Sequence, residues 1–535
     1  MKENKGILNG IRVLDLTRML SGPYCTMILA DNGAEVIKIE NSLGDTSRRA
    51  GPFRKDDKDK NWAGYFVSLN RNKKSIMLNL KSKVDQERFF ELVKTAHILV
   101  ENFRPGVMER LGISYETLSK INKKLVYGSI KGFGDPRLGE SPYSTWPSYD
   151  VVAQAMGGIV SLTGINKKKP LKVGPGIGDI FTGSLLSFGL ISALRNAEKK
   201  GEGQFVDVAM YDSMISLCER AIYQYSFSGN VPEPHGNRHP FLAPFGIYKV
   251  KDGHIALGIV EDNLWEKFLT IVGKRKLLKK NKFSNVENRS KNQKKVNKLV
   301  SKTLIKYTKK ELTKILGGHV PFGPVNNFKE IINDLHLKKR EMLVSIPHND
   351  NQKQPWLVSG SPIKFSKTKQ PIFKTAPKLG QHNNILFKKT TKNVIDLNFN
   401  QERFINFDYF LVYYFDSNKN LIYFFIDNLQ FFKKSRRLIF FEITRKTRNI
   451  SSIKDIDFFI LNGFLSKQIS KKNMYNLVKK KRNWIDKKGK VPHFTFSDEF
   501  FYFKKEKFLE IDKKLIVFAK LTKIDTMNIL AENKN

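Results

Sequence analysis

Residues 7–210 show short apolar runs that alternate with amphipathic segments. The apolar runs, at 11–17, 34–40, 76–80, 97–100, 125–130 and 203–209, are typical of buried strands. Between them, at 24–31 and 84–96, apolar residues recur every three or four positions, as on one face of a helix. Strands that alternate with helices form parallel sheets with helices on both faces. The pattern therefore predicts an α/β domain built on a Rossmann-like parallel sheet.

A glycine-rich loop at 173–178 precedes the longest apolar helical pattern, which runs from Ile180 to Leu194. Lys199 and Lys200 followed by Gly201 indicate where this helix ends. Asp179 is thus expected at the N-cap or in the first turn of a buried helix, where free amides and the helix dipole favour a negative charge. An ionised, approachable carboxylate suits nucleophilic catalysis. Asp is also among the commonest N-cap residues, so a purely structural cap is the alternative.

The pattern changes after about residue 235. A turn-rich segment is followed by Asp252-Gly253, a hairpin signal, and by a strand at 254–260 and a helix at 263–272. Residues 320–327 read as a rigid turn, and 342–346 and 356–358 as short strands. These features predict a second, smaller α+β domain.

The chain therefore divides into five predicted parts. A C-terminal stretch rich in Phe, Tyr, Ile and Lys has strand patterns at 407–415, 421–426, 438–443 and 515–521, which predict an extra α+β extension of unknown role. The parts are the N-terminal portion of the large domain at 1–209, a linker at 210–235, the small domain at 236–335, a linker and return segment to the large domain at 336–390, and the extension at 391–535.

Composition narrows the possible partners. The chain has 535 residues and a formal net charge of +43, which invites a nucleic-acid interpretation. The basic residues are spread over the whole chain, as A/T-rich codons would produce, so we expect no nucleic-acid partner. A basic surface also suits a ligand that carries several phosphates.

Cysteine and histidine spacing argues against a structural metal. Two cysteines, Cys25 and Cys218, do not make a disulfide framework or a zinc cage, and His235, His239 and His382 lack metal-ligand spacing. The N-terminus has no signal-peptide core, and no apolar run reaches the roughly 18 residues of a membrane span. We expect a cytoplasmic protein without metal or membrane partner.

Separated segments within about residues 7–390 resemble the class III CoA-transferases, the CaiB/BaiF family, whose members include formyl-CoA transferase and succinyl-CoA:glutarate CoA-transferase. The segments are a strand followed by Gly22-Pro23, the strand at 34–40, Asn70 to Ser75, Gly178-Asp179-Ile180-Phe181-Thr182-Gly183, Gly323 to Asn327, and Pro377 to His382. In that family the Asp of a Gly-Asp-x-x-[ST]-Gly motif attacks the acyl-CoA. The resemblance implies an enzyme that transfers CoA to a carboxylic acid through covalent intermediates on Asp179.

The resemblance also implies where CoA binds, as a substrate rather than a tightly held cofactor. The family's CoA-binding segments match Arg18, Met19, Leu78, Lys81, Asn102, Phe103, Arg110 and Lys131, and a loop over the site matches Gly236 and Asn237. Asn41 departs from the pattern, because relatives often carry an Arg near the nucleotide there. The family further implies an interlocked homodimer.

Two alternatives stay open at this point. An α-methylacyl-CoA racemase uses an Asp and a His as paired bases, but the matching place here is Tyr149-Asp150, and a Tyr is a poor proton shuttle at neutral pH. A non-catalytic CoA-binding protein is the alternative from another class. The segments at Asn70 to Ser75 and Gly323 to Asn327 are closest to the succinyl-CoA:glutarate type, although both lie outside the expected pocket.

Overall fold

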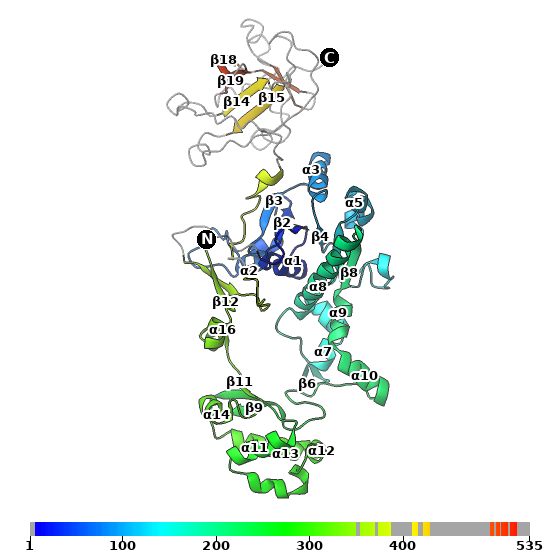
Figure 1. The fold of residues 1–535 in the computed structure, drawn as a ribbon, viewed down its shortest axis with the longest axis vertical. Coiled ribbons are helices and arrows are strands. Elements are labelled where there is room, and N and C mark those ends of the chain that lie inside the picture. Colours follow the sequence, from blue (N-terminus) through cyan, green and yellow to red (C-terminus); the bar gives the residue numbers. More distant parts are fainter. Residues whose placement is uncertain are drawn as a thin grey trace. The chain divides into compact units, whose positions relative to one another are not determined.

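A six-stranded sheet forms the centre of the large domain in the computed structural model (Figure 1). All neighbouring strands pair in parallel, in the order β3-β2-β1-β4-β5-β8. The strands are β1 (Arg12–Asp15), β2 (Glu35–Glu40), β3 (Lys74–Met77), β4 (Ile98–Glu101), β5 (Val126–Lys131) and β8 (Phe205–Ala209). The predicted parallel sheet is confirmed. The strand order reverses between β1 and β4, and open α/β sheets bind ligands at such a switch point.

The structure describes residues 6–348, 354–369 and 373–386, and six strands in the C-terminal part of the chain. Residues 1–392 form one compact unit and residues 393–535 another.

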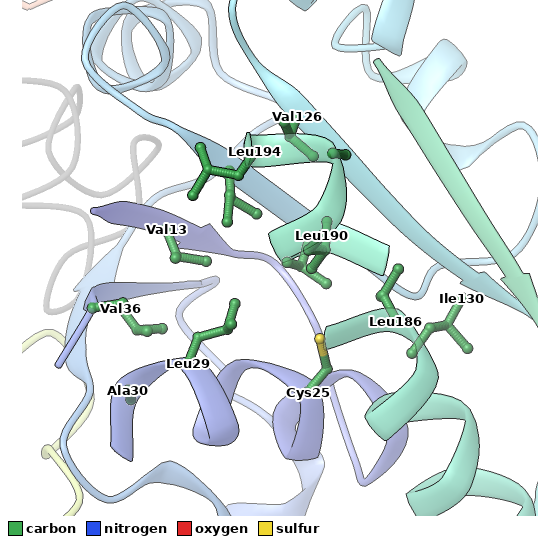
Figure 2. Packing of buried hydrophobic residues seen from close by; sticks show 14 of the residues in the cluster. Val13, Cys25, Leu29, Ala30, Val36, Val126, Ile130, Leu186, Leu190 and Leu194 are labelled. Atoms are coloured by element: carbon green, nitrogen blue, oxygen red, sulfur yellow. The ribbon is translucent and has the colours of Figure 1, made fainter. Parts of the chain in front are cut away.

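Each face of the sheet carries its own apolar core, because successive strand residues point to opposite sides. Val13, Val36 and Val126 pack with α1 (Ser21–Asp31) and α8 (Ile177–Lys200), as Figure 2 shows. Their chain neighbours Leu14, Ile37 and Tyr127 belong to the opposite core, with α3 (Lys83–Val93) and α5 (Tyr115–Ile121). This doubly covered arrangement is what the alternating pattern predicted.

α8 has the length and apolar composition of a membrane-spanning helix, with 24 residues. Its Leu186, Leu190 and Leu194 are buried in the core shown in Figure 2, against strands of the sheet and α1. Its apolar character therefore matches its place as a central packing helix.

Some element boundaries differ from those expected. α1 begins at Ser21 rather than 24, because Pro23 lies in the first helical turn, where its missing N–H is not needed. β3 covers Lys74–Met77 rather than 76–80. The segment at 210–235, expected as a linker, begins with two helices, α9 (Met210–Leu217) and α10 (Glu219–Ser228), with a break at Cys218.

The smaller sheet has the antiparallel order β11-β10-β9. The predicted hairpin at Asp252-Gly253 joins β9 to β10, and the segment at 320–327, expected as a rigid turn, contains β11. The sheet strands are β9 (Phe245–Val250), β10 (Gly253–Gly258) and β11 (Phe322–Pro324), and the covering helices are α11 (Asp262–Ile271), α12 (Val286–Lys291), α13 (Gln293–Leu304) and α14 (Lys309–Leu316). Trp265, Phe268 and Val300 are fully or almost fully buried in its core.

The segment after the small sheet returns to β3. The backbone N–H of Ser75 donates to Nδ1 of His382 (3.1 Å), and the backbone N–H of His382 donates to the Ser75 carbonyl (2.8 Å).

The remaining helices and strands of this unit are α2 (Gly64–Asn70), α4 (Val107–Arg110), α6 (Asp150–Met156), α7 (Ile159–Leu162), β6 (Gly164–Asn166), β7 (Lys169–Pro170), α15 (Phe328–Ile332), α16 (Leu335–Lys339), β12 (Leu343–Ile346) and β13 (Trp356–Ser359), with 3-10 turns at Thr46–Arg49, Pro136–Leu138, Arg275–Lys279, Asn281–Phe283 and Asn383–Leu386.

The C-terminal unit contains an antiparallel sheet in the order β15-β14-β19-β18 and a hairpin of β16 and β17. The expected segment at 438–443 lies outside the described residues. The strands are β14 (Tyr409–Phe415), β15 (Leu421–Asp427), β16 (His493–Phe496), β17 (Glu499–Tyr502), β18 (Lys504–Ile511) and β19 (Lys514–Leu521).

The close packing of α1 on α8 gives a first prediction. A Cβ added at Gly183 would lie 2.4 Å from the Ser21 carbonyl oxygen, which is backbone and cannot rotate away. We expect Gly183→Ala to push the helices apart and lower the free energy of unfolding by about 1–3 kcal/mol, measured by urea denaturation. Gly174→Ala is the control, because nothing lies within 4 Å of its added Cβ. Equal stability of the two variants would contradict this account of the contact.

Candidate active site

Asp179 lies in the first turn of α8, two residues after the helix begins at Ile177. The first-turn prediction is confirmed, but the N-cap is Gly176 and no side chain caps this helix. The interpretation of Asp179 as a plain N-cap is therefore wrong. Its half-buried carboxyl group lies near Asp150 and accepts a hydrogen bond from Ser21 at the start of α1.

Burial, and after it the nearby Asp150 carboxylate, raise the pKa of Asp179 from 3.8 to about 6, although the Ser21 hydrogen bond acts in the opposite direction. The expectation from the helix dipole was the opposite direction. Loss of hydration and a like charge outweigh the dipole here. At pH 7 the group is still mostly ionised, and its basicity is higher than that of an ordinary carboxylate.

Asp150, at the start of α6, fixes the loop that leads to Asp179. Its Oδ1 accepts the backbone N–H of Gly178 (2.7 Å), and its Oδ2 accepts Nε2 of Gln154 (2.8 Å). The Oε1 of Gln154 in turn accepts the N–H of Val173 (2.8 Å). A Cβ at Gly178 would lie 3.0 Å from Asp150 Oδ1, so glycine permits this close approach. The Gly178 amide is therefore occupied by Asp150.

Tyr65 on α2 belongs to the same surroundings. The Asp179, Asp45 and Asp150 carboxylates, together with burial as the main cause, raise the pKa of Tyr65 to about 12. Its hydroxyl therefore stays protonated and can donate a hydrogen bond in this acidic environment. No sequence pattern pointed to this residue, because α2 was not predicted.

Two loops meet at the switch point between β1 and β4. The Asn102 side-chain amide pairs with the backbone of Arg18: Oδ1 accepts the Arg18 N–H (2.9 Å) and Nδ2 donates to the Arg18 carbonyl (2.8 Å). The Arg18 guanidinium lies 5.0 Å from the centre of the Phe103 ring. The structure therefore brings together three of the residues that resemblance assigned to CoA binding.

Buried ion pairs lie just behind these loops, and sequence reasoning missed them. Lys73 Nζ is 3.1 Å from Asp15 Oδ2, and Lys38 Nζ is 3.0 Å from Asp45 Oδ2, with all four side chains fully buried. Asp15 and Lys38 lie within the first two strands of the predicted βαβ pattern, Asp45 lies in the turn after the second strand, and Lys73 lies just before β3. The position of these charges in the sequence could have revealed the ion pairs, since a charged side chain inside a sheet covered on both faces must find a partner.

The other predicted CoA-binding residues differ in exposure. Leu78 is buried in the core on the α3 side, whereas Lys81 and Arg110 are exposed. Lys131 is almost fully buried and forms an ion pair with Glu101 (2.6 Å) while donating to the Phe103 carbonyl (2.8 Å). Its ammonium is therefore already neutralised.

The loop residues Gly236 and Asn237 are exposed, and Gly236 donates its N–H to the Gly164 carbonyl (3.0 Å). Among the described residues, no hydrogen bond joins either of them to Asp179. Asn41, where relatives often carry Arg, uses its side chain to accept the Leu43 N–H (3.0 Å). The exposed Arg49 donates to the Leu43 carbonyl (2.7 Å), so a base does stand beside that turn.

The chain is similar to known proteins in sequence and in fold. Residues 8–383 match the model of CoA-transferase family III. The succinyl-CoA:mesaconate CoA-transferase of Haloarcula marismortui is 42% identical over 379 residues, which cover 70% of this chain and 94% of that protein. The succinate–glutarate CoA-transferase of Agrobacterium fabrum is 33% identical over 386 residues, covering 71% and 95%. A CaiB/BaiF family protein from Brucella suis has a similar structure, with a TM-score of 0.63, 32% identity, and coverage of 72% of this chain and 99% of that one.

The pKa of Asp179 predicts a pH dependence. If the ionised carboxylate reacts, kcat/KM for the acyl donor should fall as pH drops through about 6. Asp150→Asn removes the like charge, so the midpoint should move to lower pH. Asp207→Asn is the control, because burial raises the pKa of Asp207 to about 6 as well, and we expect this variant to keep the wild-type midpoint. If the midpoint moved in Asp207→Asn and not in Asp150→Asn, ionisation of Asp179 would not be the cause of the pH dependence.

Proposed function

The chain belongs to CoA-transferase family III, and from this membership we propose that Asp179 is the nucleophile through which the enzyme moves CoA from an acyl-CoA to a carboxylic acid. The observation that carries the proposal is the half-buried Asp179 carboxylate at the start of α8, inside the family-like motif and with a pKa raised to about 6. A carboxylate that has lost part of its hydration is a stronger nucleophile than one in water.

The proposed steps conserve charge and involve no redox change. Asp179 attacks the thioester carbonyl, CoA thiolate leaves, and an acyl-aspartyl anhydride forms. The thiolate attacks the aspartyl carbonyl of that anhydride, which releases the donor acid and leaves an aspartyl-CoA thioester. The acceptor carboxylate attacks this thioester and displaces the thiolate, which then attacks the acceptor's own carbonyl. The acceptor leaves as acyl-CoA, and Asp179 is restored as a carboxylate.

We propose succinyl-CoA as donor and a short dicarboxylic acid as acceptor. Two relatives carry names of this type, one with mesaconate and one with glutarate. The Asn70 to Ser75 segment that suggested the glutarate type supports this less, because Arg71 and Lys73 form buried ion pairs there with Asp31 and Asp15. A panel of acyl-CoA donors against mono- and dicarboxylic acids, with products identified by mass spectrometry, tests the assignment.

The nucleophile can be trapped. With donor alone, hydroxylamine should convert Asp179 to a hydroxamate and borohydride should reduce it to an alcohol, each seen as a mass change on the peptide that contains Asp179. Asp179→Asn should lower kcat by about 10⁴- to 10⁶-fold, as with other nucleophiles, because an amide cannot attack the thioester usefully. An active Asp179→Asn enzyme, or a label on another peptide, would contradict the proposal.

A stability measurement separates lost chemistry from lost fold. The folded-state pKa of Asp179 is raised from 3.8 to about 6, so the free energy of unfolding falls as pH rises between these two values, and the full cost of the charged form is present above about pH 6. Asp179→Asn should therefore be as stable as the wild type near pH 4 and up to about 2–3 kcal/mol more stable at pH 7.5. A non-catalytic CoA-binding protein would give the same stability result but no exchange of labelled CoA into acyl-CoA.

We further propose that the enzyme works as a homodimer. α10 has no buried residue, yet it carries Ile222, Tyr223, Tyr225 and Phe227, which are 51%, 50%, 57% and 91% exposed. Exposed apolar side chains gathered on one helix indicate a protein interface. The family's interlocked dimer, with linkers that pass between the domains, would cover this helix and bring a Gly236 loop to each site.

Sedimentation tests the dimer. The wild type should remain dimeric on dilution, since such a dimer separates only with unfolding. Phe227→Glu combined with Tyr223→Glu should weaken assembly or lower the yield of folded protein. Val84→Glu on α3, where Val84 is 57% exposed, serves as the control and should leave the sedimentation coefficient unchanged. A stable, folded wild-type monomer would contradict the proposal.

A further inference from the structure

Met19 adopts a left-handed backbone conformation, with φ of 65°, in the turn that follows β1. This conformation strains a residue with a long side chain, at a cost of the order of 1 kcal/mol. Such a turn persists only when its surroundings hold it. Met19 is also one of the residues that the resemblance assigned to CoA binding.

A buried ion pair holds this turn at both of its ends. Asp45 Oδ1 accepts the Met19 N–H (3.2 Å), and Lys38 Nζ donates to the Thr17 carbonyl (2.7 Å). Lys38 and Asp45 are themselves paired at 3.0 Å, with both side chains fully buried. We call these two residues the Lys38–Asp45 clamp.

The clamp is itself fixed from several sides. Asp45 Oδ1 also accepts the Ser47 N–H (2.9 Å), and the Asp45 N–H donates to Glu40 Oε2 (3.0 Å). Lys38 is stabilised in its charged form by Asp15 and Glu40 as well as by Asp45, so its pKa is raised in spite of burial. The pair can therefore not shift without disturbing β1 and β2.

The clamped turn leads directly to the groups around the nucleophile. Leu20 is the N-cap of α1, and a Cβ added at Gly176 would lie 2.9 Å from its Cδ2, so Leu20 lies against the loop before Asp179. Ser21, the first residue of α1, donates to the Asp179 carboxylate. A change in the Met19 turn therefore moves a hydrogen bond on the reacting group.

We propose that Asp45, held by Lys38, is a positioning residue for the transfer reaction: it fixes the strained Met19 turn and thereby aligns Ser21 with the Asp179 carboxylate. The inference rests on the proposed role of Asp179 as the nucleophile. Asp45 touches no reacting atom in this account and acts only through the turn.

Asp45→Asn is the first test. It removes the charge that holds Lys38, so the turn should loosen and kcat/KM should fall about 100-fold, as expected for a misplacement of about 1 Å. The pH midpoint of kcat/KM should also move upward from about 6, because the Ser21 hydrogen bond that lowers the pKa of Asp179 is weakened. The other groups that face Asp179, Asp150 on α6 and Tyr65 on α2, are both still present in this variant, but Tyr65 loses the Asp45 charge that contributes to its raised pKa.

Asp31→Asn is the matched control. Asp31 forms a similarly buried ion pair with Arg71 (2.6 Å) in the same domain, but within the part of the chain that the structure describes it forms no hydrogen bond or ion pair with the Met19 turn. It should lose stability while keeping the wild-type pH midpoint. A merely structural role for Asp45 would make the two variants behave alike.

A second pair of variants keeps the inference testable if Asp45→Asn does not fold. Lys38→Arg keeps the buried charge but changes its contact with Thr17, and should give the same upward shift with a smaller loss of rate. Met19→Gly added to Asp45→Asn should recover part of kcat/KM, because glycine adopts a φ near 65° without strain. An unshifted midpoint in Lys38→Arg, or no recovery with Met19→Gly, would overturn the inference.

Trapping of Asp179 in the wild type separates the two proposals. If hydroxylamine labels Asp179 there, but Asp45→Asn and Lys38→Arg keep the wild-type rate and midpoint, only the positioning role fails. If hydroxylamine labels no Asp179 in the wild type, the proposed nucleophile fails, and the positioning role fails with it.

Discussion

Two buried ion pairs beside β1 and β2 determine much of the geometry around the site. Asp15 pairs with Lys73, and Lys38 pairs with Asp45, inside a sheet covered on both faces. Buried pairs of this kind are tolerable only when further hydrogen bonds satisfy the remaining donors and acceptors. The Asp15–Lys73 pair meets this condition, because Asp15 also accepts hydrogen bonds from Thr17 and Thr26. Lys73 also donates to the Pro23 carbonyl, the Thr26 hydroxyl and the Asn70 side-chain oxygen. Removing one partner would leave an uncompensated charge, at a cost of several kcal/mol.

Two carboxyl groups in this domain show how environment decides their use. Asp15 is completely buried, yet the Lys73 and Lys38 charges and two threonine hydroxyls overcome the effect of burial and lower its pKa to about 2. Asp179 is less buried, but its burial, followed by the like charge of Asp150, raises its pKa to about 6. The first group is locked in its charged form and holds structure. The second is destabilised in its charged form, which is the condition that favours a reactive carboxylate.

The sequence was enough to predict the parallel sheet, the helices on its two faces and the position of Asp179 in the first turn of α8, because apolar periodicity and glycine spacing report local structure directly. It was not enough to find the ion pairs. Lys38 in β2 and Lys73 just before β3 look like ordinary polar positions until the pairing of β2 with β1 and β3 places them beside Asp45 and Asp15. The direction of the Asp179 pKa shift failed for the same reason. The effect of a helix dipole can be predicted from one segment of the sequence, whereas Asp150 lies 29 residues before Asp179 and comes near it only through folding.

The same distinction bears on how CoA is held. Among the basic residues that resemblance assigned to CoA, Lys131 forms an ion pair with Glu101 and donates to the Phe103 carbonyl. These contacts stabilise the loop after β4 from its buried side. Arg18, Lys81 and Arg110 are exposed, so their charges remain hydrated and can exchange water for phosphate oxygens at little cost. Asn102 ties the Arg18 backbone in place through both atoms of its amide. The basic residues that resemblance assigned to CoA thus fall into two sets. The charge of Lys131 is used to build a loop, whereas the charges of Arg18, Lys81 and Arg110 are exposed, and under the proposed function the exposed set neutralises the phosphates of a bound acyl-CoA.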